Sequence, residues 1–283
     1  MSTLSSKIDF AVILRVDHAN PNGDPLNGNR PRTDYGGLGE ISDVCLKRKM
    51  RDRLQEAGQR IFVQSDDRAD DGAKSLAERA TKELKEDFGN SATMAKKACE
   101  VWLDVRTFGQ LFALKGKKAS KGKEDEGGGD TGISIPIRGP VSVQTAFSVE
   151  PVEVTSTQIT KSVSGEGDGT KRSSDTMGMK HRVDRAVYVF RGSMNPQLAE
   201  RTGFSDADAE AIKKVLPKLF ENDASSARPE GSMSVLKVLW WRHSSRAGQY
   251  SSARVHSTLK VAPNGSYTLE NLDGLAPEEI DGF

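Results

Sequence analysis

The sequence predicts an α+β protein with a ferredoxin-like βαββαβ core that carries large insertions. Three observations support this fold class. Residues 10–16 (FAVILRV) form a short, β-branched apolar run, which favours a buried strand over a helix. An amphipathic helix pattern follows, and alternating strand patterns, another helix and further strands come later. With 283 residues, the chain is long enough to bury such a core in one domain.

The first helix is predicted directly after a loop, with Ser42 as its N-terminal cap and Gly58 as its stop. Its apolar face consists of Leu46, Met50, Leu54 and Ala57. We expect the remaining surface to carry the cations Lys47, Arg48, Lys49, Arg51 and Arg53. Set against Asp52 alone, they would create a positive potential suited to a phosphate backbone. The alternative is an ordinary solvated basic face without a ligand.

The loop before this helix is rich in residues that tolerate left-handed and turn conformations, namely Asn20, Asn22, Gly23, Asn27, Gly28 and Asn29. We expect backbone N–H groups of this loop to face an anion. The same region contains His18, Asp24 and Asp34, which could form a metal-dependent nuclease site, because carboxylates can hold Mg²⁺ against a phosphate. We prefer to interpret them as turn-forming residues, because Asx side chains commonly bond to nearby backbone.

Two inserted helices are predicted next. The first covers 73–88 and ends at Gly89, and its apolar stripe is Leu76, Ala80, Leu84 and Phe88. The second carries its apolar residues at Met94, Ala98, Val101, Trp102 and Val105. Residues 115–132 are rich in lysine, glycine and acids, and this composition predicts a mobile loop.

Period-two patterns predict strands at 133–137 and 141–147. The segment that follows has extended ends around a centre rich in glycine and serine. We interpret it as a long hairpin with its tip near 164–178.

The last third of the chain contains one helix and further strands. Ser205 and Asp208 have the spacing of a capping box, and Pro217 is expected to kink the helix or end it early. Strands are predicted at 235–241 and 253–261, and the second of these turns at Asn264–Gly265.

Composition limits the classes of function. The 41 Lys and Arg residues nearly balance the 40 Asp and Glu residues, so affinity for nucleic acid would require segregated charge. Cys45 and Cys99 are too few for a disulfide framework and lack zinc-site spacing. The segment GEGDGTKRS at 165–173 imitates a phosphate-binding loop with the wrong spacing. With neither a signal peptide nor an apolar run of membrane length, a cytoplasmic protein without metal or cofactor is expected.

Four separated segments resemble one known family in the same order. They are NPNGDPLNGNRPR, ISDVCLKRKMRDRLQ, DVRTFGQLFA and IPIRGPVSVQTAFSV. The chain resembles, from about residue 8 to about residue 260, the repeated backbone subunit of type I-C CRISPR Cascade complexes, which is the Cas-seven family in its Csd-two subgroup.

The resemblance implies one hand-shaped domain. Its palm would be related to the RNA-recognition motif and cover 8–58, 101–149 and 183–262. A helical finger insertion would cover 59–100, and a β-hairpin thumb would cover 150–182. Several copies would stack head to tail along a guide RNA (crRNA), and each thumb would displace one base.

The resemblance also implies which residues contact the guide. The RNA-binding candidates are Asn20, Asn22, Gly23, Asn27, Asn29, Arg32, Lys47, Arg48, Lys49, Arg51, Arg138, Lys171, Arg172, Lys180, His181 and Arg182. Met177 and Met179 are candidates for the base-displacing wedge, or they pack the hairpin onto a neighbouring copy. No predicted strand carries the paired stacking aromatics of an RNA-recognition motif, which favours holding the RNA backbone over reading bases.

The function implied is a non-enzymatic subunit that presents guide RNA for pairing with target DNA in antiviral defence. Its partners would be guide RNA, target DNA, further copies of this chain, and Cascade subunits of the Cas-five and Cas-eight types, with no membrane involved. Two alternatives remain open. One is a metal-dependent ribonuclease of the same fold, and the other is a general single-strand RNA-binding protein.

Overall fold

A computed structural model of the protein describes residues 2–114, 133–160 and 177–283. Its largest element is an eight-stranded sheet with the order β14-β11-β1-β10-β8-β4, in which neighbouring strands are antiparallel. These strands are β1 (Ile8–Ala19), β4 (Leu38–Ile41), β8 (Ala146–Pro151), β10 (Met177–Met194), β11 (Met233–Arg242) and β14 (Glu278–Asp281). Strands β7 (Val141–Val143) and β9 (Val154–Thr160) also pair with β10.

Strand β1 is central because it is apolar on both faces. Phe10, Val12 and Leu14 belong to the larger apolar cluster of the core, whereas Ala11 and Ile13 belong to a second cluster on the opposite face. The predicted buried strand is therefore confirmed.

Helices α1 (Asp43–Glu56) and α6 (Asp206–Val215) pack on the face of the larger cluster, together with α5 (Pro196–Thr202). The predicted caps are confirmed. Ser42 accepts a hydrogen bond from the N–H of Cys45, and Ser205 forms a capping box with Asp208. Helix α6 ends before Pro217, which lies in the 3-10 turn η5 (Leu216–Lys218).

The opposite face is covered by α7 (Ser252–Ser257) and the small hairpin of β12 (Leu259–Val261) and β13 (Tyr267–Leu269). The prediction of a strand over 253–261 was wrong for its first half. Ser251 accepts a hydrogen bond from the N–H of Arg254 and so starts a helix, which buries Val255 against the sheet. The predicted turn at Asn264–Gly265 is confirmed between β12 and β13.

A separate unit lies between α1 and β7. It contains η2 (Asp66–Arg68), α2 (Leu76–Leu84), η3 (Lys85–Asp87), α3 (Ser91–Val101), α4 (Leu103–Phe108), β5 (Gly109–Leu114) and β6 (Ile133–Arg138). Its own apolar cluster includes Phe62, Trp102 and Phe112. The second predicted helix is interrupted at Trp102, whose backbone is extended. The expected mobile loop at 115–132 lies outside the described residues.

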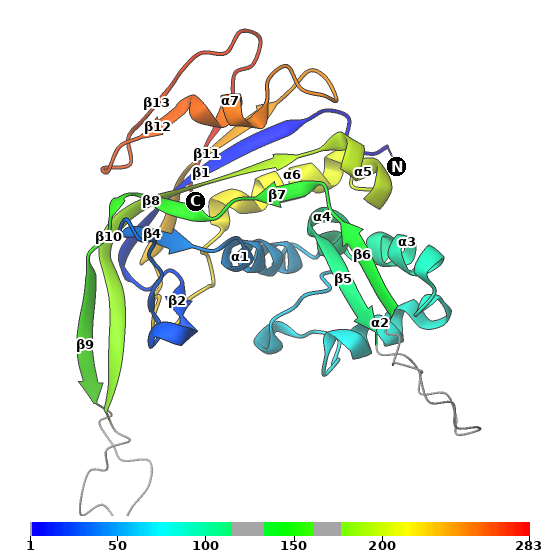
Figure 1. The fold of residues 1–283 in the computed structure, drawn as a ribbon, viewed down its shortest axis with the longest axis horizontal. Coiled ribbons are helices and arrows are strands. Elements are labelled where there is room, and N and C mark those ends of the chain that lie inside the picture. The colour runs from blue at the N-terminus through cyan, green and yellow to red at the C-terminus, as the bar shows by residue number, and fades with distance from the viewer. Residues whose placement is uncertain (1, 115–132, 161–176) are drawn as a thin grey trace, which may run out of the picture.

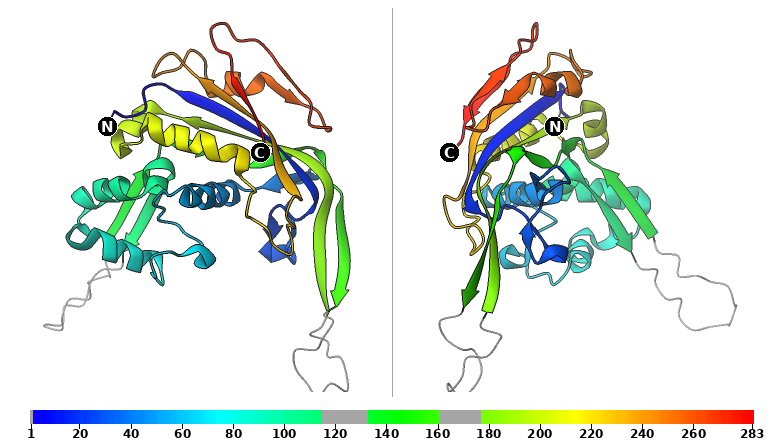
Figure 2. Two further views of the ribbon diagram at one scale, coloured as in Figure 1. Left: turned by 180° about the vertical axis from the view of Figure 1, so that it is seen from behind. Right: turned by 60° about the vertical axis from the view of Figure 1, so that its left-hand side comes forward.

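Strands β9 and β10 form a hairpin that runs beyond the edge of the sheet, from the pair Val154 and Val183 to the pair Thr160 and Met177. Figure 1 shows this hairpin and the α2–α3 unit extending from the same side of the sheet, with α1 and the loop around β2 between them. The views in Figure 2 agree with this arrangement. Residues 161–176, with most of the predicted tip, lie outside the described residues. No helix of the described part is long and apolar enough to cross a membrane.

Candidate nucleic-acid interface

The Asn/Gly-rich loop is a small folded unit. Strand β2 (Gly23–Asp24) pairs with β3 (Arg30–Pro31), and the 3-10 turn η1 (Pro25–Asn27) connects them. Gly28 and Asn29 are left-handed, with φ of 58° and 59°, as the composition predicted. The side-chain amide of Asn20 donates to the carbonyl of Asn29 at 2.7 Å and closes the base of the loop.

Several backbone N–H groups of this loop already have protein acceptors. The amide of Asn29 donates to the carbonyl of Asp24, and the amide of Arg32 donates to the carbonyl of Asn22. The amide of Asn20 donates to the carbonyl of Ala227. The expectation that N–H groups here face an anion was therefore wrong for these three, because two of them bond within the loop and the third bonds to the segment after α6.

Asn22 ties the loop to helix α1. Its side-chain oxygen accepts hydrogen bonds from both the N–H and the hydroxyl of Ser42, each at 2.9 Å. A Cβ atom at Gly23 would lie 2.0 Å from the side-chain oxygen of Asn29 and 3.0 Å from its carbonyl oxygen, so a larger residue here would displace the Asn29 side chain. These two predicted site residues therefore position the loop.

The three residues considered for a nuclease site have separate structural tasks. The imidazole of His18 lies 3.4 Å from the carboxylate of Asp184. Asp24 caps η1 and pairs with Arg32 at 3.3 Å. Asp34 accepts hydrogen bonds from two amides of its own turn, each at 2.8 Å. Among the described residues, no group of three or more His, Cys, Asp or Glu side chains is arranged to hold a metal ion.

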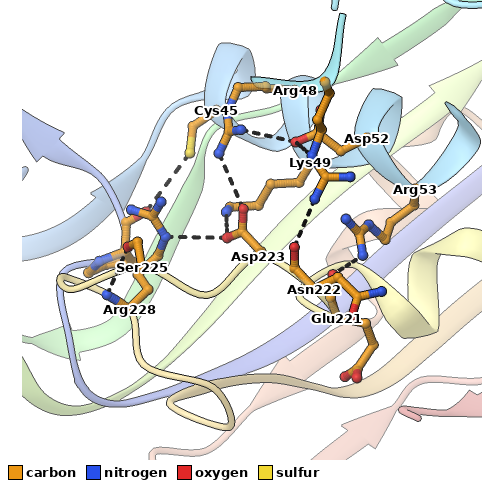
Figure 3. A network of polar contacts seen from close by, with 12 residues as sticks. Cys45, Arg48, Lys49, Asp52, Arg53, Glu221, Asn222, Asp223, Ser225 and Arg228 are labelled. Atoms are coloured by element: carbon orange, nitrogen blue, oxygen red, sulfur yellow. Dashed lines mark hydrogen bonds and ion pairs between the residues drawn. The ribbon is translucent and has the colours of Figure 1, made fainter. Parts of the chain in front are cut away.

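Helix α1 differs most from the prediction. We expected five cations on its surface, but Lys49 is fully buried and the side chain of Arg53 is only 4 % exposed. Lys49 donates to Asp223, and Arg53 donates to the carbonyl of Glu221. Figure 3 shows both side chains pointing from the helix toward the segment after α6, which supplies these acceptors.

The other three cations of α1 are also paired. Lys47 bonds to Asp43 at 2.9 Å, and Arg51 bonds to Asp104 at 2.9 Å. Arg48 lies between two carboxylates, at 3.0 Å from Asp52 and 3.3 Å from Asp223. The expected free positive face is therefore largely neutralised. Asp43 and Asp52 of the helix itself supply two of the carboxylate partners, and Asp104 and Asp223 supply the others from elsewhere in the chain.

Arg48 and Lys49 share the carboxylate of Asp223 as an ion-pair partner. Burial alone would raise the pKa of this carboxyl group, but Lys49, Arg228 and Arg48 together hold it below the ordinary value. For Asp52, burial is the larger effect and raises its pKa despite the neighbouring Arg48. Asp223 is therefore the ionised centre that makes the burial of Lys49 tolerable.

The hairpin β9–β10 differs from helix α1 in the partners and the exposure of its polar side chains. The hydroxyl of Ser156 contacts the imidazole of His181 at 2.8 Å and accepts a hydrogen bond from Arg30 of the loop at 3.0 Å. Arg182 pairs with Asp184 at 3.0 Å and keeps 42 % of its side chain exposed. Lys180 makes no ion pair with any described residue.

Loop and hairpin meet at a cavity of about 280 Å³. It is lined by Asn20, Gly28, Asn29, Ile159, Met179, Lys180, His181, Ser226 and Ala227. Five of these residues were predicted to bind RNA or displace a base, and they come from two segments about 150 residues apart in the chain. Amide groups, an ammonium group, an imidazole and a thioether here match the needs of a phosphate, a sugar and a base.

The predicted residues divide into those at this cavity and those elsewhere. Asn27 is exposed at the tip of the loop, and Met177 is 59 % exposed next to Met179, which is 54 % exposed. Arg138 is exposed at the end of β6, in the α2–α3 unit. Lys171 and Arg172 lie outside the described residues. RNA contacts of all these residues stay predictions.

Sequence reasoning did not single out Ile159 of this cavity or three further residues at this interface. Arg30 joins the loop to the hairpin, and Ser226 and Ala227 form one wall of the cavity. The only signal for the last two was the Ser/Pro/Gly-rich composition of ASSARPEGS, which indicates a loop but gives no location.

Comparisons with known proteins agree on one family. A family model described as "CRISPR-associated protein Cas7" matches residues 6–275. A protein of Haloferax volcanii described in the same words is 27% identical over an aligned length of 283. The alignment covers 96% of this chain and 80% of that protein.

Two solved structures are also similar to this chain. One is described as "CRISPR RNA-guided surveillance complex, pre-nicking", with a TM-score of 0.47 and 14% identity, covering 83% of this chain and 78% of that one. The other is described as "CRISPR RNA-guided surveillance complex", with a TM-score of 0.47 and 16% identity, covering 92% of this chain and 78% of that one.

Proposed function

The chain belongs to the Cas7 family of CRISPR-associated proteins, and from this premise we propose that it is the backbone subunit of a type I-C Cascade complex, of the Csd-two subgroup. In this role it binds guide RNA in the cytoplasm and presents it for pairing with target DNA. The observation that carries the proposal is the cavity at which the Asn/Gly-rich loop and the hairpin β9–β10 meet. Copies of the chain stack head to tail on the guide, beside subunits of the Cas-five and Cas-eight types.

The arrangement of strands supports a palm of the ferredoxin-like, RNA-recognition-motif-like type. Strands β1, β8, β10 and β11, taken in chain order as 1 to 4, lie in the order 4-1-3-2, and helices α1 and α6 pack on one face. In this proposal the α2–α3 unit is the finger, and it extends from 59 through β6 because β5 and β6 share its apolar cluster. The hairpin β9–β10 is the thumb.

The chemistry of the cavity supports holding the RNA backbone without regard to sequence. Lys180 supplies an ammonium group that has no ion-pair partner among the described residues, and Arg30 is oriented toward the hairpin by its hydrogen bond to Ser156. Phosphate contacts of this kind position RNA and carry no base information. A guide carrier needs this property, because pairing with the target supplies the specificity.

Met177 and Met179 support a role in displacing a base. They alternate with Gly178 on β10, so both lie on the same face of the hairpin as His181. More than half of each side chain is exposed, and that exposure is costly unless a partner covers it. An inserted thioether would unstack a base as apolar wedges do in DNA.

We propose that the chain is not an enzyme. Asp24 and Asp34 each use their carboxylate oxygens within their own turns, and this supports the structural interpretation. Incubating purified protein with Mg²⁺ or Mn²⁺ and guide-paired RNA or DNA is expected to leave both strands intact. Cleavage that is abolished by Asp24→Ala would instead support the alternative of a metal-dependent ribonuclease.

The experiment that tests the function is sequencing of the RNA that copurifies with the protein. The expected result is spacer sequences flanked by CRISPR repeats, whereas random cellular RNA would support the general RNA-binding alternative. Lys180→Ala should lower the amount of bound RNA, because it removes a cavity cation. Lys260→Ala is the matched control, since Lys260 is exposed on β12 and does not line the cavity.

Assembly is tested by electron microscopy and nuclease footprinting on a long guide. We expect head-to-tail filaments with regularly spaced sensitive nucleotides. The double variant Met177→Ser, Met179→Ser should keep RNA binding but weaken the periodic sensitivity. An unchanged pattern would show that the methionines pack against a neighbouring copy instead of displacing bases.

A further inference from the structure

Arg191 has an unusual environment on the face of the sheet that α7 and β12 cover. It pairs with Ala11 in the sheet register and points to the same side as Val189, because they alternate along β10. Its guanidinium group makes no hydrogen bond or ion pair with any described residue, and partial burial lowers its pKa. A half-buried charge without a partner is costly, so a ligand that supplies a counter-charge would be favoured.

Asp9 of β1 is fully buried on the same face, yet it makes no ion pair with Arg191. One carboxylate oxygen of Asp9 accepts hydrogen bonds from Lys7 at 2.9 Å and His243 at 2.8 Å, and the other has no hydrogen-bond partner among the described residues. Arginine presents a planar fork of donors that matches a carboxylate with two parallel bonds. The N–H groups of Arg191, which no described residue accepts, are therefore available to pair with a carboxylate.

Arg191 lines a cavity of about 330 Å³. Its apolar lining is Phe147, Val149, Val189 and Val261, and its neutral polar lining includes Gln144 and Thr145. Phe147 is 41 % exposed although it lies in a strand between β4 and β10. No residue of this cavity belongs to the loop and hairpin cavity.

The composition of the cavity selects the class of ligand. Within the described parts of the chain, Arg191 is the one cation that lines it, whereas a nucleic acid strand requires several cations along its backbone. Apolar walls around one guanidinium group suit a single carboxylate with an aliphatic neighbour. We propose that this cavity is a docking site for a protein partner, in which an aspartate, glutamate or C-terminal carboxylate pairs with Arg191 and an adjacent aliphatic side chain packs on Phe147 and Val149. This site is independent of RNA binding.

The test uses the full chain with methyl NMR of Val149, Val189 and Val261 as the readout. The probe is the blocked dipeptide N-acetyl-Leu-Glu-amide, added up to about 20 mM, and its control is N-acetyl-Leu-Gln-amide. We expect saturable shifts with the glutamate probe and binding at least about tenfold weaker with the glutamine probe, because a hydrogen bond to a charged group is lost. Equal binding of the two probes, or shifts with neither, would overturn the proposal.

Variants separate the guanidinium group from the rest of the cavity. Arg191→Gln should weaken the glutamate probe about tenfold without unfolding the chain, since it removes an unpaired charge, and Lys260→Gln outside the cavity should have no effect. Should Arg191→Gln disturb the methyl spectrum, Arg191→Lys keeps the charge and is expected to bind less tightly than the unsubstituted chain. Displacement of the probe by a short oligouridylate, but not by a second acidic dipeptide, would identify a nucleic acid site and contradict a protein partner.

Discussion

Helix α1 and the hairpin β9–β10 both carry several cations, yet Lys49 of the helix and Lys180 of the hairpin have opposite environments. In α1, Lys49 is fully buried and donates to Asp223. In the hairpin, Lys180 lines an open cavity and has no carboxylate partner among the described residues. The number of cations in a segment therefore does not determine the charge that it offers to a ligand, because pairing and burial decide how much remains available.

The physical reason lies in the neighbours of each segment. Helix α1 packs between the sheet and the segment after α6, which brings Asp223 and the Glu221 carbonyl to its cations. The hairpin extends past the sheet edge. Its polar contacts there are between Ser156 and His181 and between Arg182 and Asp184, and Arg30 of the loop donates to Ser156. We expect substitutions in α1 to change stability most, and substitutions in the hairpin to change RNA binding most.

The largest expected effect is on stability. Asp223→Asn should lower the free energy of unfolding by about 3–5 kcal/mol, because it leaves the buried Lys49 without its carboxylate. Urea denaturation measures this loss. Glu200→Gln is the matched control, since Glu200 pairs with Arg246 on the surface and should contribute less than about 1 kcal/mol.

A second variant sharpens this result. Lys49→Met combined with Asp223→Asn should recover much of the loss, because an apolar side chain replaces the buried charge. A double variant as unstable as Asp223→Asn alone would mean that Asp223 acts mainly through Arg48 and Arg228.

The next effect is on RNA affinity. Arg30→Ala with Lys180→Ala should weaken binding by about tenfold or more and reduce the salt dependence by about two phosphate contacts, irrespective of RNA sequence. Fluorescence anisotropy at several salt concentrations measures both. Lys47→Ala with Arg51→Ala in α1 removes the same charge and should have the smaller effect, because Asp43 and Asp104 already pair with these cations.

A smaller effect concerns an ion pair of intermediate burial in the α2–α3 unit. The hydrogen bond from Arg79 lowers the pKa of Asp71 to about 2, from an ordinary value of 3.8. The folded state therefore binds fewer protons, so this contribution is full above about pH 5 and is lost as the pH falls toward 2. Because Asp71 is 38 % exposed, it should amount to less than about 1 kcal/mol.

This pH dependence is measured as the difference in unfolding free energy between the unsubstituted chain and Asp71→Asn. The difference should be constant near neutral pH and shrink below about pH 4. A difference that does not change with pH would show that Arg79 and Asp71 contribute through packing alone.

The smallest expected effect is the change in the unfolding free energy when the exposed methionines of the hairpin are replaced. Met177→Ser with Met179→Ser should change the unfolding free energy by less than about 0.5 kcal/mol, because both side chains are more than half exposed. Thermal and urea unfolding of the RNA-free protein measure it. A loss comparable with that of Asp223→Asn would mean that the methionines belong to the folded core.

The sequence alone predicted the elements that depend on near neighbours. The β-branched run of β1, the Ser42 cap, the capping box at Ser205 and the turn at Asn264–Gly265 are all as expected. Each depends on residues at most six positions apart, so the local pattern contains the information. At 252–257 two local signals competed, and the cap at Ser251 with burial of Val255 favoured a helix over alternation.

Only the tertiary structure decided which polar residues are available. Four segments resemble those of a Cas7 backbone subunit, and these residues identified the family from the sequence alone. They did not reveal that Asp223 pairs with Lys49 or that Ser226 and Lys180 line the same cavity. Burial and pairing depend on residues that are up to about 170 positions apart in the chain. The free energy of a charge is set by its solvent and its nearest counter-charge, and the folded chain alone brings these together.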